Sequence, residues 1–189
     1  MSDFKEIILG ISGASGAVYG IRLLEILREL NVKTHLIITK PAQITIAQET
    51  DYTLDDVKKL SFKFHGSNDI AACISSGSYK TIGMIVAPCS VKSVAEIANG
   101  LGGNLLSRSA DVMLKERRKL VLMVRETPLH SVHLRNMLTL SEMGAIIAPP
   151  APAFYNNPQS LDDIVNHNVG RMLDLFDLDS DVVKRWKGL

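Results

Sequence analysis

Lys5-Glu6-Ile7-Ile8-Leu9-Gly10-Ile11-Ser12-Gly13-Ala14-Ser15-Gly16 is a short apolar run that ends in small residues, and an amphipathic segment from Val18 to Leu30 follows it. This order is typical of a strand, a tight turn and a helix. Glycines let the turn adopt positive φ and approach a ligand closely, and free N–H groups at a helix N-terminus attract anions. We therefore expect a phosphate-bearing ligand at this first turn, with hydroxyl donors from Ser12 and Ser15.

The spacing of the glycines favours one class of ligand over another. Gly10, Gly13 and Gly16 form G-x-x-G-x-x-G rather than the G-x-G-x-x-G of dinucleotide-binding proteins. The next strand, predicted at residues 33–38, is followed by Thr39-Lys40 and not by the acidic residue that binds a ribose. A single phosphate, as in flavin mononucleotide (FMN), fits this pattern better than NAD.

The composition restricts the class of protein. The chain has 189 residues, which suits one domain spanning residues 1–189, and a net charge of +1, which does not favour nucleic acid or an anionic membrane as a partner. No run of 18 apolar residues and no signal-peptide pattern are seen, so we expect a cytoplasmic protein without membrane insertion. Cys73 and Cys89 lack metal-ligand spacing and are expected to be buried thiols. An apolar content of 46% also favours a homo-oligomer.

Short apolar runs alternate with helical segments along the whole chain. Strands are predicted at residues 6–11, 33–38, 84–87, 120–124 and 145–148. Helices are predicted at residues 17–30, 42–50, 54–60, 91–99, 104–117, 129–143 and 161–176. Thr53 and Ser160 are expected to cap the helices that follow them, as is Thr127 with Pro128 in the first helical position. The pattern predicts an α/β fold with a doubly wound parallel sheet and helices on both faces.

Two loops and one proline-rich segment are candidates for the site. Residues 87–93 and 125–128 each follow a predicted strand, and ligands of open α/β sheets bind at the carboxyl ends of strands. Residues 149–158 contain four prolines in a stiff segment that could hold Phe154 and Tyr155 in a pocket wall or serve only as a connector. Arg108 and Lys115 are seven residues apart and should share one helix face.

Several separated motifs together resemble the UbiX-type flavin prenyltransferases. They are Gly10-Ile11-Ser12-Gly13-Ala14-Ser15-Gly16, Pro88-Cys89-Ser90, Ala110-Asp111-Val112-Met113-Leu114-Lys115-Glu116-Arg117-Arg118, Arg125-Glu126-Thr127-Pro128 and Ala153-Phe154-Tyr155-Asn156-Asn157-Pro158-Gln159-Ser160. The resemblance implies a three-layer, flavodoxin- or Rossmann-like fold and assembly into a dodecamer. It also implies metal-independent transfer of a dimethylallyl group from dimethylallyl monophosphate to N5 and C6 of reduced FMN. The prenylated FMN would then serve a partner decarboxylase of the UbiD type.

The same resemblance implies roles for individual residues. FMN would be bound by Gly13, Ala14, Ser15, Thr39, Ser90, Val91, Lys92, Ser93 and Arg125. The prenyl phosphate would be surrounded by Arg108, Lys115, Glu126, Tyr155 and Arg171, with Trp186 closing over the pocket. Lys115, Arg125 and Arg171 would stabilise the departing phosphate. Glu49 is the candidate base for the proton lost at C6, and Ser15 could orient or relay a proton at N5.

Two alternatives remain open at this point. The first is an FMN-dependent decarboxylase that acts directly on an aromatic acid or a cysteine, for which Cys89 beside the flavin loop would be a candidate reactive group. The second is a non-catalytic flavin-binding subunit, which would need the glycine turn but not Glu49, Lys115, Tyr155 and Arg171 together.

Overall fold

The chain folds around one parallel sheet of six strands in the order β3-β2-β1-β4-β5-β6. The computed structural model describes residues 5–183, 185 and 188. Its strands are β1 (Glu6–Ile11), β2 (Lys33–Ile38), β3 (Lys63–Gly66), β4 (Gly83–Cys89), β5 (Lys119–Val124) and β6 (Ile146–Ile147). This strand order is that of the Rossmann fold, and it places a topological switch between β1 and β4.

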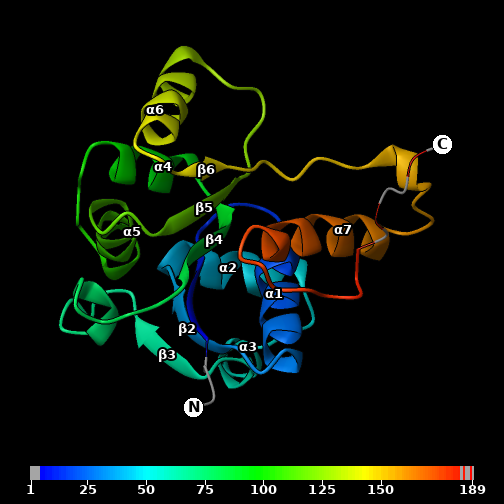
Figure 1. Ribbon diagram of the computed structural model, residues 1–189, viewed down its shortest axis with the longest axis horizontal. Helices are drawn as coiled ribbons and strands as arrows, with labels where there is room; N and C mark the ends of the chain where they lie inside the picture. Colours follow the sequence, from blue (N-terminus) through cyan, green and yellow to red (C-terminus); the bar gives the residue numbers. More distant parts are fainter. Residues whose placement is uncertain (1–4, 184, 186–187, 189) are drawn as a thin grey trace.

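Helices cover both faces of the sheet and give three layers (Figure 1). The α-helices are α1 (Ala17–Glu29), α2 (Lys40–Glu49), α3 (Leu54–Leu60), α4 (Val91–Ala98), α5 (Leu105–Lys115), α6 (Ser131–Glu142) and α7 (Leu161–Asp174), and short 3₁₀ turns form η1 (Cys73–Ser75) and η2 (Phe154–Asn156). One apolar core joins the sheet to α1 and α7, and the other joins it to α4, α5 and α6.

The strands are apolar throughout because both of their faces are covered. In β1, Ile7 and Leu9 pack into the core on the α1 side, whereas Ile8 packs into the core on the α5 side. Successive side chains of a strand point to opposite faces, so a strand buried on both sides shows a continuous apolar run rather than an alternation. The sheet is therefore a rigid platform whose carboxyl edge carries the loops described below.

Most predicted elements are confirmed, with two differences. The strand β3 was not expected, since Lys63-Phe64-His65-Gly66 is short and Phe64 is its one strongly apolar side chain. The expected cap at Thr127 is wrong: α6 begins at Ser131, and the ring of His130 accepts the backbone N–H of Val132 there. By contrast, Thr53 and Ser160 cap α3 and α7 as expected. None of the helices in the described part of the chain combines the length and apolar character needed to cross a bilayer.

Candidate functional site

A cleft of about 730 Å³ lies along the carboxyl edge of the sheet. It is lined by Gly13, Ala14, Ser15, Thr39, Lys40, Pro41, Ser67, Asn68, Ser90, Val91, Lys92, Ser93, Glu96, Asn104, Arg125 and Glu126. Most of these residues come directly after β1, β2, β3, β4 or β5, so loops distant in sequence meet over the switch between β1 and β4. The volume lies within the range of ordinary small-molecule and cofactor sites, about 300–1,000 Å³.

The first loop approaches the second helix so closely that only glycine fits at one position. A Cβ on Gly13 would lie 2.3 Å from Cβ of Pro41, at the start of α2. Ser12 is fully buried, and its hydroxyl donates to the carbonyl of Pro88 at 3.0 Å and accepts the N–H of Ser90 at 2.7 Å. The hydroxyl of Ser12 therefore joins two loops of the cleft and is not free for a ligand, which corrects the expectation from the sequence.

The N-terminus of α1 is occupied by a side chain of the protein itself. Oε2 of Glu49, the last residue of α2, accepts the backbone N–H of Gly16 at 2.7 Å and that of Ala17 at 3.1 Å. A carboxylate is a strong acceptor for these otherwise unpaired N–H groups. The expectation that the first turn offers a free helix end to a phosphate is therefore wrong. Glu49 thus contacts the residue that follows Ser15, which lines the cleft, but Glu49 itself is not among the lining residues.

Two other helix N-termini open onto the cleft. The Thr39 hydroxyl caps α2 by accepting the backbone N–H of Ala42. The Ser90 hydroxyl caps α4 by accepting the backbone N–H of Ser93. Helix starts favour negative charge, and Lys40, Lys92 and Arg125 line the same cleft. The acidic lining residues are Glu96, 3.6 Å from the ammonium of Lys92, and Glu126. The cleft thus offers hydroxyls, two helix starts and basic groups, a combination that suits a phosphate-bearing ligand such as FMN.

All nine residues expected to bind FMN line this cleft, and Glu126 lines it as well. Six further lining residues were not expected from the sequence: Lys40, Pro41, Ser67, Asn68, Glu96 and Asn104. Ser67 and Asn68 follow β3, the strand that was not predicted, so the sequence did not indicate that they lie at the carboxyl edge of the sheet. Asn104 caps α5, and its amide also donates to Glu96 at 3.1 Å, which fixes both side chains at the rim.

Four residues expected at the prenyl phosphate lie outside the lining of the cleft within the described part of the chain. Arg108 pairs with Asp111 at 2.8 Å, and Lys115 pairs with Glu116 near the end of α5. Tyr155 packs edge-on against His167, and Arg171 pairs with Asp174 at 2.7 Å on α7. Trp186 lies outside the described residues. One chain therefore assembles the predicted flavin site but not the predicted prenyl phosphate site.

Cys89 has the properties of a structural thiol. It is fully buried in the core on the α5 side, and burial raises its pKa far above the usual range of a thiol. A thiol that does not ionise and does not line the cleft is a poor nucleophile. This position argues against the alternative in which Cys89 reacts with a substrate.

Comparison with known proteins gives a consistent result. The family model described as Flavoprotein matches residues 1–185. The chain is 55% identical to the flavin prenyltransferase UbiX of Thauera aromatica over 183 residues, covering 97% of this chain and 94% of that protein. The crystal structure of AnUbiX (PadA1) with FMN and dimethylallyl pyrophosphate superimposes with a TM-score of 0.97 at 52% identity, covering 98% of both chains. The dodecameric FMN-dependent UbiX-like decarboxylase from Escherichia coli O157:H7 gives a TM-score of 0.95 at 52% identity, covering 97% of this chain and all of that chain.

Proposed function

Because the chain belongs to the flavoprotein family and, within it, to the UbiX flavin prenyltransferases, we propose that its cleft is where reduced FMN is prenylated. The enzyme is a transferase that joins a dimethylallyl group, supplied by dimethylallyl monophosphate, to N5 and C6 of the flavin. The product is prenylated FMN, the cofactor of a UbiD-type decarboxylase. The free thiols of Cys73 and Cys89 support a reducing compartment, and we place the enzyme in the cytoplasm.

The observation that carries this proposal is the convergence of the flavin-binding residues on one cleft. Residues of the glycine turn, of the start of α2 and of the start of α4 meet there with Arg125, although they come from widely separated parts of the chain. Gly13 packs so closely against Pro41 that only glycine fits there, which holds the first turn against the start of α2 at the edge of the cleft. The phosphate of FMN would face the starts of α2 and α4, since Glu49 already occupies the start of α1.

The chain supplies charge and a base, and the reduced flavin supplies the nucleophilic N5 and C6 atoms. Lys115, Arg125 and Arg171 would stabilise the phosphate as the allylic C–O bond breaks, because fixed positive groups act where negative charge develops. Glu126 and Tyr155 would orient the phosphate end of the prenyl donor. Glu49 would accept the proton lost at C6, and Ser15, next to it at the first turn, would orient the proton at N5.

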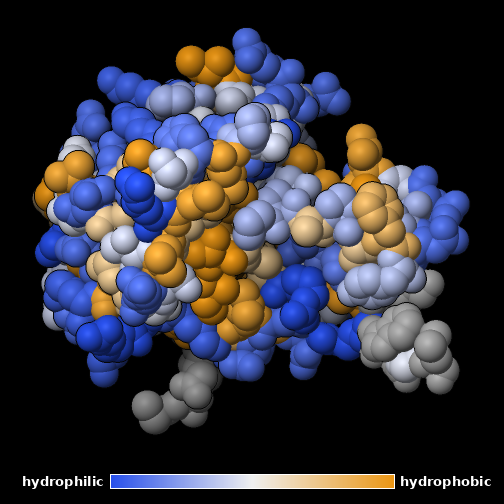
Figure 2. Space-filling model, turned by 90° about the horizontal axis from the view of Figure 1, so that it is seen from above, coloured by the Kyte–Doolittle hydropathy of each residue, from blue (hydrophilic) through white to orange (hydrophobic). Residues whose placement is uncertain are grey.

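We further propose that the site is completed by neighbouring copies of the chain. Arg108, Lys115, Tyr155 and Arg171 lie on other parts of the surface than the flavin cleft of their own chain. A dodecamer like that of the relative from E. coli O157:H7 would bring such surfaces together. In α6, Val132, Leu134 and Leu138 are all more than half exposed, which supports self-association. The face seen in Figure 2 carries a band of apolar groups across its middle.

The proposal is tested by anaerobic incubation of the purified protein with FMN, dithionite and dimethylallyl monophosphate. Mass spectrometry of the extracted flavin should show a gain of one C5H8 unit, and none when the prenyl donor is omitted. Arg125→Ala should abolish the gain, whereas Arg28→Ala, an exposed position at the end of α1, should not. Unmodified FMN recovered from folded, flavin-bound protein would instead favour direct decarboxylation or a carrier role.

A further inference from the structure

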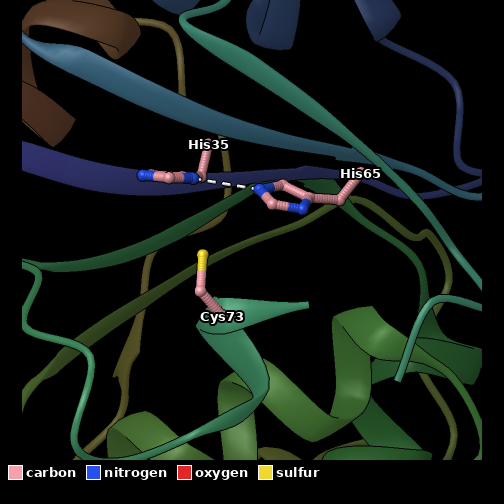
Figure 3. A group of neighbouring side chains, drawn as sticks. All are labelled: His35, His65 and Cys73. Atoms are coloured by element: carbon pink, nitrogen blue, oxygen red, sulfur yellow. Dashed lines mark hydrogen bonds between the residues drawn. The ribbon is translucent and has the colours of Figure 1, made fainter. Parts of the chain in front are cut away.

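Two histidines and a cysteine meet in the protein interior, away from the lining of the flavin cleft. His35 of β2 and His65 of β3 are 1% and 3% exposed, and Cys73 of η1 is half-buried. One donor atom from each of the three residues lies within 4.8 Å of the other two. Figure 3 shows the two rings side by side and the Cys73 sulfur pointing toward them from below. Three elements thus direct nitrogen and sulfur donors at one point.

The orientation of His35 is fixed from its far side. Its Nε2 lies 3.1 Å from Oε2 of Glu6, and the hydroxyl of Tyr79 donates to the same oxygen at 2.5 Å. A carboxylate oxygen can only accept in such a contact, so the Glu6 carboxylate accepts the N–H of His35 Nε2. The lone pair of His35 is therefore on Nδ1, which faces His65 Nε2 at 2.9 Å.

A carboxylate that contacts one side of a histidine, with further donor atoms on the other side of the ring, is a pattern typical of metal sites. A histidine that binds a metal usually donates its other N–H to a carboxylate, which fixes the ring and increases its basicity. Here Glu6 occupies that outer position, while His35 Nδ1, His65 Nε2 and Cys73 Sγ face inward. A merely structural histidine pair does not require a thiol on the same side of both rings.

We propose that His35, His65 and Cys73 bind a zinc ion, with Glu6 as the residue that positions His35. On binding, the proton that His65 Nε2 shares with His35 moves to His65 Nδ1, and the thiol proton of Cys73 is released to solvent. The two positive charges of the zinc ion and the negative charge of the thiolate leave a net charge of +1 at the site. The Glu6 carboxylate, which contacts His35 on its far side, lies close enough to offset this charge. Imidazole and thiolate together favour zinc over magnesium or calcium.

The geometry requires only small movements. Zinc binds nitrogen at about 2.0–2.1 Å and sulfur at about 2.3 Å, which separates neighbouring ligand atoms by about 3.5 Å. His35 Nδ1 and His65 Nε2 are 2.9 Å apart and must move slightly away from each other. Cys73 Sγ, within 4.8 Å of a nitrogen of each ring, must move closer to both rings. The ion would join β2, β3 and the segment around η1, and a water molecule on the Cys73 side would complete four ligands. None of the three ligands lines the flavin cleft, so this site is separate from prenyl transfer.

The test is a titration of the metal-stripped, full-length oligomer with Co²⁺ and then with Zn²⁺. We expect one Co²⁺ per chain, an ultraviolet band from sulfur-to-cobalt charge transfer, and loss of that band when Zn²⁺ displaces the cobalt. Cys73→Ser should abolish the sulfur band, and Glu6→Gln should weaken binding about 10–100-fold. Cys89→Ala is the matched control, because Cys89 is a free thiol outside the cluster, and should behave like the wild type.

A second pair of histidines must be distinguished from this cluster. His130 and His133 stack with ring centroids 3.5 Å apart at the start of α6 and could bind cobalt through nitrogen alone. His130→Gln should leave the sulfur band unchanged. Absence of binding, binding without a sulfur band, or binding lost in His130→Gln but retained in Cys73→Ser would each overturn the proposal. Retention of FMN and of the oligomer, measured on the same samples, shows that the variants remain folded.

Discussion

Glu49 combines a structural and a chemical role at one carboxylate, and two substitutions separate them. Its Oε2 accepts two backbone N–H groups at the start of α1, and an amide oxygen can accept the same bonds. Glu49→Gln should therefore keep the stability of the wild type but lower the rate of prenylation roughly 10²–10⁴-fold, because the base is lost. Glu49→Ala should also lower the free energy of unfolding, by about 1 kcal/mol, as loss of a helix cap does.

Single-turnover prenylation, followed by mass spectrometry, and urea unfolding measure the two effects independently. An unchanged yield of prenylated flavin from Glu49→Gln would remove Glu49 from the reaction and leave it only as a cap. The sequence could identify this residue only through family resemblance. Its position beside Ser15 depends on the packing of α2 against α1, which no local pattern encodes.

At the level of elements, the serine after β1 determines how the loops of the cleft are joined. Ser12 links the end of β1 to the end of β4 by accepting Ser90 N–H and donating to Pro88. Ser12→Ala leaves the Ser90 N–H without this acceptor, and we expect a loss of about 1–3 kcal/mol in the free energy of unfolding. FMN should also bind more weakly, since Ser90 begins the helix that faces the cleft.

Urea unfolding of the flavin-free protein and fluorescence titration with FMN check both parts of this prediction. Ser141→Ala, at an exposed position of α6, is the matched control and should stay within about 0.5 kcal/mol of the wild type. If Ser12→Ala changed neither quantity, the link between the two loops would be dispensable for the shape of the cleft.

The elements were predictable where local signals were strong. Apolar runs such as residues 6–11 and capping residues such as Ser160 encode their strand or helix locally, and both are confirmed. Lys63–Gly66 becomes a strand only because it pairs with β2 at the sheet edge, so Ser67 and Asn68 could not be placed at the cleft. Thr127 and His130 lie in the same short loop, and the pattern of the sequence does not distinguish which of them begins α6.

At the level of the whole molecule, the separation between the flavin cleft and Lys115 predicts that an active site belongs to more than one chain. Arg125 lines the cleft, whereas Lys115 pairs with Glu116 near the end of α5 and is absent from the lining of the cleft among the described residues. Arg125→Ala and Lys115→Ala should each inactivate the enzyme when every copy carries the change. Mixed oligomers, however, would contain sites that take Arg125 from one chain and Lys115 from another.

Co-expression of the two variants in equal amounts should therefore restore prenylation. If each site combines two randomly assorted chains, about a quarter of the sites contain both intact residues, and about a quarter of the wild-type rate should return. Co-expression of Arg125→Ala with Glu49→Gln is the control. Arg125 lines the cleft and Glu49 contacts the turn after β1 of the same chain, so no mixture should recover activity. Failure of the first pair to recover, in oligomers shown by native mass spectrometry to be mixed, would mean that Lys115 serves the cleft of its own chain after a rearrangement of α5.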